Sequence, residues 1–374
     1  MKILIIYAYA GIGHKKAADA VFSRLSSHKE ISVENIDALD YTTKFFKFMY
    51  PRAYLFMIDR APYLWGFFYY FFEIGIIDKV FSPIRRFFHC LSARRFIDFI
   101  AESRPDIVLC THFLPVDVLS DLKEKGLFKG KLIALITDFL PHNFWIAKNI
   151  DYYIGCLKET ADELIKRGIK EDKIKVLGIP CDEKFNIKKD KEGLIKKLGL
   201  KHGLFNILVM GGGFGTGPVF KIAKHISELA SSIKDKIQLV VICGKNKSLF
   251  KRLEEIRSGS SINLGIFGYM DNVDEFMEIS DLIVTKSGGL TTSEALSKRL
   301  PMIIIEPILG QETRNCDILT DSGVAKKADS VQEVIDHLKD LVVSPQKIEE
   351  MRKNIDRLSY SDASQKIAGL ILNI

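Results

Sequence analysis

Short apolar runs of strand length recur along the chain, and they alternate with longer segments whose apolar residues follow a helical period. The strands expected in the first half are Ile3 to Tyr7, Ile107 to Cys110, Leu132 to Ile136, Tyr152 to Gly155 and Lys175 to Leu177. Those expected in the second half are Ile207 to Met210, Gln238 to Cys243, Leu264 to Phe267, Leu282 to Val284 and Met302 to Ile305. The helical stretches between them include Lys16 to Ser26 and Glu159 to Lys166. Because parallel strands are joined by helical crossovers, this alternation predicts parallel sheets.

The alternation is interrupted between Gly178 and Lys201, where Pro180 and the lysine-rich stretch from Asn186 to Lys197 break the pattern. A chain of 374 residues that is 47% hydrophobic is too long for one comfortable core and has ample apolar material for two. We therefore expect an α/β protein of two doubly wound domains, residues 1–184 and 185–347, with a C-terminal segment of residues 348–374. The helical part of that segment, Ile348 to Leu372, is expected to pack back on the first domain.

Glycine-rich turns follow two of the strands expected in the second half. One is Gly211-Gly-Gly-Phe-Gly-Thr-Gly217, and Pro218 after it suits the first turn of a helix. The other is Thr285-Lys-Ser-Gly-Gly289, which leads from a buried strand into a helix. Open parallel sheets bind ligands at the carboxyl ends of their strands, and a helix start offers unpaired N–H groups and the positive end of a dipole. Small residues at such a helix start predict a site for a diphosphate.

Several function classes are disfavoured by what the sequence lacks. Neither turn matches G-x-G-x-x-G or G-x-x-x-x-G-K-[ST], which argues against dehydrogenases and P-loop kinases. The cysteines show no CxxC or Cys/His metal spacing, so we interpret them as reduced core thiols of a cytosolic protein. They are Cys90, Cys110, Cys156, Cys181, Cys243 and Cys316. The net charge of +7 favours an anionic partner, which a nucleotide, a membrane surface or a nucleic acid would each satisfy.

Seven motifs that occur in order along the chain resemble those of a known family. They are Gly11-Ile-Gly13-His14; Thr137-Asp138 with His142 and Trp145; Gly211 to Gly217; Cys243-Gly-Lys-Asn246; Gly268-Tyr-Met-Asp-Asn272; Thr285 to Gly289; and Gly310-Gln-Glu312 with Asn315. From residue 1 to about residue 345, the chain resembles the processive diacylglycerol glycosyltransferases and monogalactosyldiacylglycerol synthases. These enzymes are similar in fold to the peptidoglycan lipid-linked N-acetylglucosaminyl transferase. The resemblance implies a GT-B architecture, with two Rossmann-like domains facing a central cleft, a UDP-sugar held by the second and a lipid acceptor by the first.

The resemblance also implies an inverting reaction without a cofactor or an essential metal. Consistent with this, the chain has no Asp-x-Asp motif of the kind that other transferases use to hold the diphosphate through a metal. Neutralising the leaving UDP then falls to Lys286, the helix start from Ser287 to Thr291 and the glycine turn, which act as preorganised donors. By the same resemblance, Glu294 accepts hydrogen bonds from the ribose, and Gln311 and Glu312 contact the hexose hydroxyls. The donor residues implied are Gly211, Gly213, Phe214, Gly215, Thr216, Lys245, Asn246, Phe267, Gly268, Tyr269, Met270, Lys286, Ser287, Gly288, Gly289, Leu290, Thr291, Glu294, Gln311, Glu312 and Asn315.

Some of these donor residues have structural alternatives. Glu294 lies three residues after Thr291, so the pair also fits the capping box [ST]-x-x-[DE]. Gln311 and Glu312 also fit a solvated helix start, and Lys286 also fits an ordinary surface lysine.

On the acceptor side, His14 stands where a glycine turn enters the first helix. Imidazole titrates near working pH and can take a proton from an attacking hydroxyl, so His14 is the candidate base. Asp138 follows an expected strand at the same edge, where it either orients His14 or replaces it. The alternatives are a capping or packing role for His14 and a turn or N-cap role for Asp138. The further acceptor-side candidates are Gly13, His112, His142 and Trp145.

The segment from Phe45 to Phe88 holds 17 of the 39 aromatic residues of the chain, interleaved with basic residues. These basic residues are Lys47, Arg52, Arg60, Lys79, Arg85 and Arg86. Its longest uncharged run, Ala61 to Phe72, is well short of the ~20 residues that span a bilayer. Aromatic rings with basic neighbours suit the headgroup region of an anionic membrane. The alternatives are a buried helical hairpin, an oligomer contact or stacking on single-stranded nucleic acid, although no nucleic-acid module is recognisable.

We expect a peripheral enzyme on the cytoplasmic side of the cell membrane that moves glucose or galactose from UDP to diacylglycerol and makes a β-linked glycolipid. Its expected partners are the UDP-sugar, diacylglycerol and the membrane, and we expect no nucleic-acid partner. The alternatives are transfer of an N-acetylhexosamine to another lipid-linked acceptor, a UDP-sugar epimerase of GT-B form, and a catalytically idle membrane-binding protein. The oligomeric state and the number of sugars added stay open.

Overall fold

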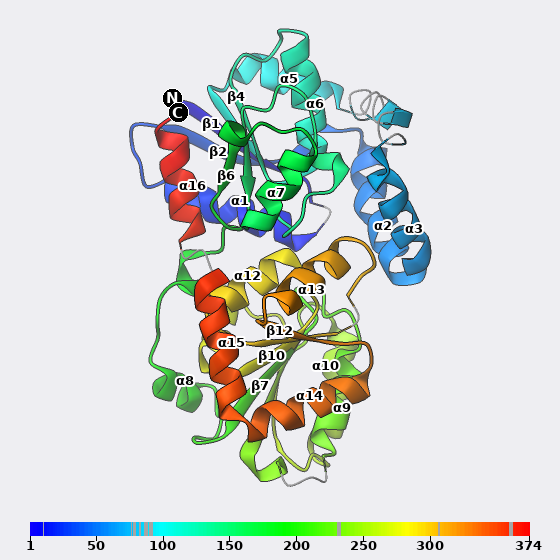
Figure 1. Cartoon of the computed structure of the whole chain (residues 1–374), viewed down its shortest axis with the longest axis vertical. Helices are drawn as coiled ribbons and strands as arrows, with labels where there is room; N and C mark the ends of the chain where they lie inside the picture. The colour runs from blue at the N-terminus through cyan, green and yellow to red at the C-terminus, as the bar shows by residue number, and fades with distance from the viewer. Residues whose placement is uncertain are drawn as a thin grey trace. The chain divides into compact units, whose positions relative to one another are not determined.

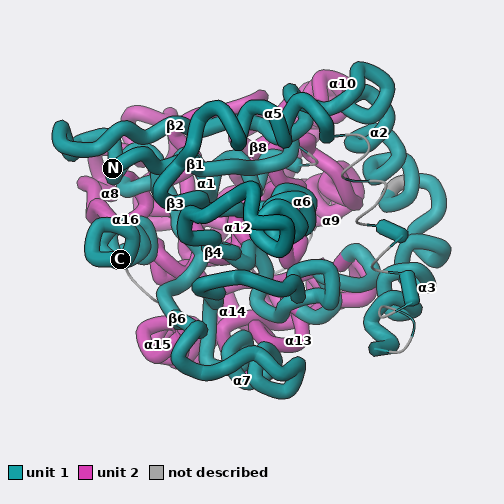
Figure 2. Tube along the Cα trace, turned by 90° about the horizontal axis from the view of Figure 1, so that it is seen from above, with its two compact units in different colours: residues 1–183, 308–314, 360–374 teal, residues 184–307, 315–359 magenta. Residues whose placement is uncertain are grey.

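The computed structural model describes residues 1–9, 11–75, 77, 80–81, 84–85, 89, 93–229, 233–305, 307–358 and 362–374. Lys79, Arg86, Phe88 and Cys90, named above, lie outside the described residues. The chain forms two compact units, which are coloured separately in Figure 2. Unit 1 comprises residues 1–183, 308–314 and 360–374, and unit 2 comprises residues 184–307 and 315–359. The chain therefore returns twice to the first unit.

Unit 1 is built on a six-stranded parallel sheet with the strand order β2-β1-β3-β4-β5-β6. Its strands are β1 (Lys2–Tyr7), β2 (Ser32–Asp37), β3 (Ile107–Cys110), β4 (Lys131–Leu135), β5 (Tyr152–Gly155) and β6 (Ile174–Val176). Successive residues of β1 face opposite layers, because Leu4 and Ile6 join one apolar core and Ile3 and Ile5 join the other. Both faces of the sheet are thus covered, as parallel sheets require. The sequence did not predict β2, because this edge strand reads Ser-Val-Glu-Asn-Ile-Asp and is only partly buried.

Helices cover both faces of the unit 1 sheet (Figure 1). The α-helices of this unit are α1 (Ile12–Leu25), α2 (Lys44–Arg60), α3 (Pro62–Glu73), α5 (Arg94–Ser103), α6 (Phe113–Glu124), α7 (Lys158–Lys166) and α16 (Ala363–Leu372). Its short 3₁₀ helices are η1 (Ala38–Tyr41), η2 (Asn143–Trp145) and η3 (Glu171–Lys173). The last helix, α16, packs against α1, so the C-terminus completes the layer that the N-terminus begins.

Unit 2 is built on a second six-stranded parallel sheet, with the order β12-β11-β10-β7-β8-β9. Its strands are β7 (Phe205–Met210), β8 (Ile237–Ile242), β9 (Asn263–Phe267), β10 (Leu282–Thr285), β11 (Met302–Ile305) and β12 (Ala325–Ala328). Its α-helices are α8 (Lys191–Lys197), α9 (Val219–Ser227), α10 (Lys247–Arg257), α11 (Val273–Ile279), α12 (Gly289–Ser297), α14 (Val331–Val343) and α15 (Pro345–Leu358), and η5 (Lys234–Lys236) is a 3₁₀ helix. A further 3₁₀ helix, η4 (Glu183–Phe185), lies where unit 1 gives way to unit 2. Helix α13 (Gln311–Asp321) starts in the segment that belongs to unit 1 and continues in unit 2.

The C-terminal region differs from the single helical segment expected over Ile348 to Leu372. It forms two helices, because α15 packs into the core of unit 2 through Ile348 and Met351, whereas α16 packs on unit 1. The sequence shows two amphipathic stretches here, but their partners lie in different units. Strand β12 was also not predicted, because Ala-Lys-Lys-Ala carries no apolar run.

Each sheet has a point where the strand order reverses direction. In unit 1 it lies between β1 and β3, and in unit 2 between β7 and β10. Chain connections on either side of such a point lead away from each other, which leaves room for a ligand at the carboxyl ends of the two strands. Most of the predicted site residues lie in the turns and helices that directly follow these four strands.

The helical hairpin formed by α2 and α3 carries most of the aromatic segment (Figure 1). Thr43 caps α2 by accepting a hydrogen bond from the Phe46 N–H at 3.2 Å, and Pro62 occupies the first turn of α3. One face of the hairpin leaves large apolar side chains exposed, for example Phe45 (75% exposed) and Tyr63 (83%). The hairpin is therefore not buried within unit 1. Among the described helices, none is both long and apolar enough to cross a membrane.

Candidate functional site

The glycine loop after β7, residues 211–217, is held in a conformation that favours glycine at several positions, and Gly211 and Gly215 are the most tightly packed of them. The Gly211 carbonyl accepts hydrogen bonds from the Thr216 N–H at 3.1 Å and from the Thr216 hydroxyl at 3.3 Å. A Cβ atom on Gly211 would lie 2.0 Å from the Thr216 carbonyl oxygen. Gly215 has φ +60°, and a Cβ there would lie 2.1 Å from the Cys243 carbonyl oxygen. The loop is thus closed on itself and pressed against the turn that follows β8.

That second turn supplies Lys245 and Asn246. The Lys245 N–H donates to the Gly213 carbonyl at 3.0 Å, and the Asn246 side-chain amide donates to the Gly215 carbonyl at 3.1 Å. Asn246 also caps α10 by accepting from the Leu249 N–H at 2.9 Å.

The turn after β9 joins the same cluster through its aromatic residue. The Lys245 ammonium lies 5.9 Å from the ring centroid of Phe214 and 5.5 Å from that of Tyr269. Tyr269 is 44% exposed. Three turns expected to contact the donor therefore meet at the carboxyl edge of the unit 2 sheet.

The turn after β10 places a lysine beside an open helix start. Helix α12 begins at Gly289, and its N-cap residue Gly288 has no side chain to occupy the first N–H groups. The Lys286 stem runs along the glycine loop, because a Cβ on Gly217 would lie 3.5 Å from Lys286 Cδ. Asn315, which is fully buried, donates to the Ser287 carbonyl at 3.0 Å and so fixes the turn. Positive charge, helix dipole and glycine loop thus adjoin at the switch point of unit 2.

The position of α12 decides between two interpretations of Glu294. Since the N-cap is Gly288, both Thr291 and Glu294 lie inside the helix, and the capping-box alternative is wrong. Contact between Glu294 and a ribose stays a prediction.

Gln311 and Glu312 lie in the segment Ile308–Arg314, which clusters with unit 1. Glu312 is only 8% exposed, and its carboxylate accepts a hydrogen bond from the Ile308 N–H at 2.9 Å. The Gln311 amide donates to the Tyr54 hydroxyl at 3.0 Å. These contacts overturn the alternative of a solvated helix start. The predicted donor residues are thus divided between unit 2 and a segment that packs in unit 1.

His14 is oriented by the turns after β3 and β4. Its Nδ1 lies 2.7 Å from the Thr111 carbonyl oxygen and 3.0 Å from the Thr137 hydroxyl. A carbonyl oxygen only accepts, so Nδ1 carries the proton of the neutral ring and Nε2 keeps a lone pair. Burial lowers the pKa of His14 to about 4, although the hydrogen bond to Thr111 acts in the opposite direction. Near pH 7 the ring is neutral, which is the form that a general base requires.

Asp138 follows Thr137, one of the two residues that hold His14. Burial raises the pKa of Tyr54 above its usual range, and the carboxylates of Glu312 and Asp138 raise it further. Asp138 likewise raises the pKa of Tyr69. The Asp138 carboxylate is therefore close to the tyrosines of the α2–α3 hairpin, and its roles as orienting group or base both stay predictions.

The structure gives structural roles to three of the other acceptor-side candidates. His112 is 2% exposed and caps α6, since its Nδ1 accepts from the Leu114 N–H at 3.0 Å. His142 uses both ring nitrogens, because Nε2 donates to the Tyr69 carbonyl at 2.9 Å and Nδ1 accepts from the Phe144 N–H at 3.1 Å. Trp145 belongs to the apolar core of unit 1, whereas Gly13 lies in the first turn of α1. Contact of these four residues with an acceptor stays a prediction.

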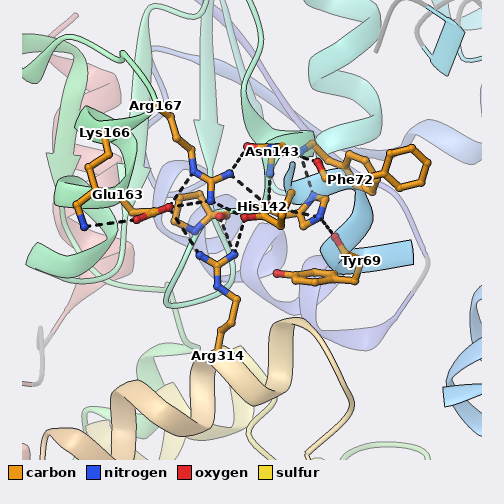
Figure 3. Close-up of polar contacts among 11 residues, drawn as sticks. Tyr69, Phe72, His142, Asn143, Glu163, Lys166, Arg167 and Arg314 are labelled. Atoms are coloured by element: carbon orange, nitrogen blue, oxygen red, sulfur yellow. Dashed lines mark hydrogen bonds and ion pairs between the residues drawn. The ribbon is translucent and has the colours of Figure 1, made fainter. Parts of the chain in front are cut away.

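A cluster of charged residues that the sequence did not predict lies beside His142 (Figure 3). The Glu73 carboxylate at the end of α3 pairs with Arg167 at 2.7 Å and with Arg314 at 3.1 Å. Burial alone would raise the pKa of Glu73, but the hydrogen bond from Arg167 and the charges of His142 and Arg167 hold it below its usual value. These residues come from four separate parts of the chain, so no local pattern marks them. Among the described residues, no group of three or more His, Cys, Asp or Glu side chains is placed to hold a metal ion.

Two family models match the chain. Residues 14–181 match the monogalactosyldiacylglycerol (MGDG) synthase family, and residues 206–367 match the glycosyltransferase family 28 C-terminal domain. A similar protein is the processive diacylglycerol beta-glucosyltransferase of Bacillus licheniformis, which is 28% identical over 376 residues, or 98% of this chain and 93% of that protein.

Two solved structures are similar along the whole chain. MurG of Acinetobacter baumannii has a TM-score of 0.67 at 14% identity, over 100% of this chain and 99% of MurG. The UDP-GlcNAc 2-epimerase of Neisseria meningitidis, solved with UDP-GlcNAc bound, has a TM-score of 0.62 at 16% identity, over 100% of both chains. At such identities the likeness shows the fold alone. That fold is the expected GT-B type, with two six-stranded parallel sheets and flanking helices.

Proposed function

We propose that this chain, which belongs to the monogalactosyldiacylglycerol synthase family of glycosyltransferases, transfers a hexose from a UDP-sugar to diacylglycerol. The observation that carries the proposal is the junction of Lys286, the open start of α12 and the glycine loop at the switch point of unit 2. A diphosphate is the anion that matches this combination of ammonium group and backbone N–H groups. The two matched family models together cover both halves of the chain.

Glucose is the hexose we propose first. The similar protein of Bacillus licheniformis bears the name of a beta-glucosyltransferase, although 28% identity leaves room for a change of sugar. Glucose and galactose differ in the configuration of one ring hydroxyl. Gln311 and Glu312 present an amide and a carboxylate that can tell such hydroxyls apart.

We propose a direct displacement in which the acceptor hydroxyl attacks the anomeric carbon from the side opposite UDP, which gives a β-linked product. Lys286 and the N–H groups of α12 stabilise the charge that builds up on the leaving diphosphate, and no essential metal is required. His14 Nε2 takes the proton of the attacking hydroxyl, while Thr111 and Thr137 hold the ring in the required tautomer. Asp138 is the second candidate for the base.

We further propose that the exposed face of the α2–α3 hairpin lies on the cytoplasmic surface of the membrane, where diacylglycerol resides. Side chains such as Phe45, Phe56, Tyr63 and Phe67 expose more than half of their surface on these two helices. Burial of one such ring in the membrane interface contributes about 1.5–3 kcal/mol, so a few rings suffice for peripheral binding. Arg52 and its basic neighbours add attraction to anionic headgroups.

The proposal is tested by incubating the protein with radiolabelled UDP-glucose or UDP-galactose, in parallel, and anionic vesicles that contain diacylglycerol, with a chelator present. Label that enters the lipid phase from one donor supports the reaction, names the sugar and supports metal independence. Consumption of UDP-hexose without lipid would instead identify an epimerase or hydrolase. Transfer only from a UDP-N-acetylhexosamine to another lipid would change both substrates. Vesicle binding without any transfer would leave an inactive membrane-binding protein.

A further inference from the structure

The inner face of the α2–α3 hairpin contacts the segment Ile308–Arg314 along its length. On α3, Gly66 adjoins Leu309 and Tyr69 adjoins Gly310, while Glu73 pairs with Arg314. Positions 66, 69 and 73 are three and four residues apart, so they lie on one face of the helix. From α2, the Tyr54 hydroxyl accepts the hydrogen bond of Gln311.

These contacts leave no spare room. A Cβ atom on Gly66 would lie 2.8 Å from Leu309 Cβ, and a Cβ on Gly310 would lie 2.6 Å from Tyr69 Cγ. Real Cβ atoms essentially never approach other atoms this closely, so either methyl group would force a shift. Tyr69 is 6% exposed. The glycines are therefore what allows the segment to lie against the hairpin.

An ion pair fixes the end of the segment (Figure 3). Arg314 donates to the Glu73 carboxylate at 3.1 Å and to the Pro141 carbonyl at 3.3 Å. Glu73 is held in turn by Arg167 and by the Asn143 N–H at 2.8 Å. Charged hydrogen bonds of this kind define a geometry strictly, because a displaced guanidinium would leave a mostly buried carboxylate poorly paired.

We infer that the α2–α3 hairpin positions Gln311 and Glu312 for recognition of the donor hexose, and that Tyr54 and Gly66 are its positioning residues. This inference rests on the proposed function, which assigns the hexose to Gln311 and Glu312. Tyr54 accepts from the Gln311 amide nitrogen, so the amide oxygen is oriented away from that contact, and in this inference it is the atom that accepts from a sugar hydroxyl. The same hairpin has an outer face proposed to bind lipid, so the element that meets the membrane also shapes the sugar site.

The sharpest test changes a residue of the hairpin and leaves the sequence of the segment Ile308–Arg314 unchanged. Gly66→Ala adds one methyl group that must displace Leu309, and alanine is the better helix former, so the helix itself is not weakened. We expect the Kd of UDP-hexose to rise about tenfold, because small displacements of positioning groups have large effects. The Kd of UDP, which lacks the hexose, should stay unchanged. The matched control is Gly369→Ala in α16, where an added Cβ meets nothing within 4 Å.

A second variant removes one hydrogen bond. Tyr54→Phe deletes the hydroxyl that accepts from Gln311, and we expect the Kd and KM of UDP-hexose to rise about fivefold, as for a neutral hydrogen bond. Tyr41→Phe is the control, because Tyr41 lies in η1 and packs its ring on Phe99 of α5. Without the Tyr54 hydroxyl, the Gln311 side chain can adopt other rotamers. We expect this to raise the KM for UDP-hexose more than it lowers kcat.

The measurements are titration calorimetry with UDP, UDP-glucose and UDP-galactose, and steady-state kinetics with diacylglycerol vesicles. A rise in Kd for the hexose nucleotide alone supports the inference. Unchanged UDP-hexose binding in both variants overturns it, as does an equal loss for UDP and UDP-hexose, because neither result isolates the sugar. The inference is also overturned if the wild-type protein binds UDP-glucose and UDP-galactose no more tightly than UDP. A wild-type protein that binds no UDP-sugar refutes the proposed function itself, which distinguishes the two failures.

Discussion

Replacing Lys286 by methionine tests how the charge of the leaving diphosphate is neutralised. Lys286 stands between β10 and the N-cap of α12, with its Cγ and Cδ at 3.9 and 3.5 Å from the position of a Cβ on Gly217. Methionine keeps this aliphatic stem and its packing on the glycine loop, and it removes only the ammonium group. Because Lys286 is half-buried at a turn, we expect a change of less than about 1 kcal/mol in the free energy of unfolding.

The expected loss of rate follows from the charge that develops on UDP. An ammonium group about 4 Å from a unit negative charge contributes about 4 kcal/mol at an effective dielectric constant of ~20. Part of this interaction is already present in the bound ground state, and the N–H groups of α12 and the glycine loop remain in the variant. Loss of one preorganised donor typically lowers kcat by about 10²–10³-fold, and we expect the lower end of that range. KM for the UDP-sugar should rise less than kcat falls.

The assay compares kcat and KM of wild type and Lys286→Met with labelled UDP-hexose, diacylglycerol vesicles and chelator. Lys224→Met is the control, because Lys224 lies on the surface of the same unit in α9, where it pairs with Glu228 at 3.8 Å. A loss of less than about tenfold in kcat for Lys286→Met would refute the reasoning. So would a wild-type activity that the chelator abolishes, since a cation would then do the work assigned to the lysine.

Three further predictions concern the base, the membrane face and the glycine loop. His14→Gln should lower kcat by about 10²-fold or more. In wild type, kcat/KM should fall as pH drops through about 4, where His14 becomes protonated and cannot accept a proton; an acid limb near 6.5 would contradict the burial argument. Replacing Tyr63 and Phe67 together by serine should weaken binding to anionic vesicles by roughly 10²-fold in a flotation assay, and unchanged binding would move the membrane contact elsewhere. Gly211→Ala should reduce UDP affinity by about 10²-fold in calorimetry, because its methyl group would collide with the Thr216 backbone, whereas Gly259→Ala, in the same unit and with only the Ile256 carbonyl oxygen at 3.9 Å, should not.

The pH dependence of stability should follow His14 and His142, two histidines whose pKa is lowered by desolvation. Burial lowers the pKa of His14 and His142 to about 4, against 6.5 for an ordinary histidine. The unfolded chain therefore binds more protons than the folded one below pH 6.5, and the stability present above that pH is lost progressively as pH falls toward 4. Protonation of His142 would in addition remove the hydrogen bond that its Nδ1 accepts from the Phe144 N–H.

The fold class could be predicted from the sequence because buried parallel strands are continuous apolar runs, which can be recognised in a few consecutive residues. The two strands that were not predicted, β2 and β12, are polar and lie at sheet edges, where one neighbour suffices and apolar residues are not needed. The glycine turns were also readable, because a strand, a turn and a helix start are contiguous in the chain. The sequence did not show that the glycine loop closes on itself or that Gly215 packs against the Cys243 carbonyl oxygen.

The roles of individual side chains likewise depended on contacts that form only in the folded chain. The type of residue at His112 and His142 suggested chemistry, but each ring is held by the N–H of a residue two positions on, and His142 also by the Tyr69 carbonyl, which ties it to α3. Whether Glu294 takes part in a capping box depended on where α12 begins, and the structure places the N-cap of that helix at Gly288. A pattern of residue types shows which groups are present, not which partners satisfy them.

Periodicity, turn chemistry and the order of the motifs are properties of neighbouring residues, and they carried the inference as far as a GT-B glycosyltransferase with a diphosphate site in its second half. The attachment of Gln311 to Tyr54, 257 positions away, and of Arg314 to Glu73, 241 positions away, exists only in the folded chain. Such contacts depend on the strand order that brings distant segments together, and on glycines whose missing side chains leave room for them. The donor-sugar segment therefore packs with the first unit for reasons of shape and charge pairing that no local stretch of sequence contains.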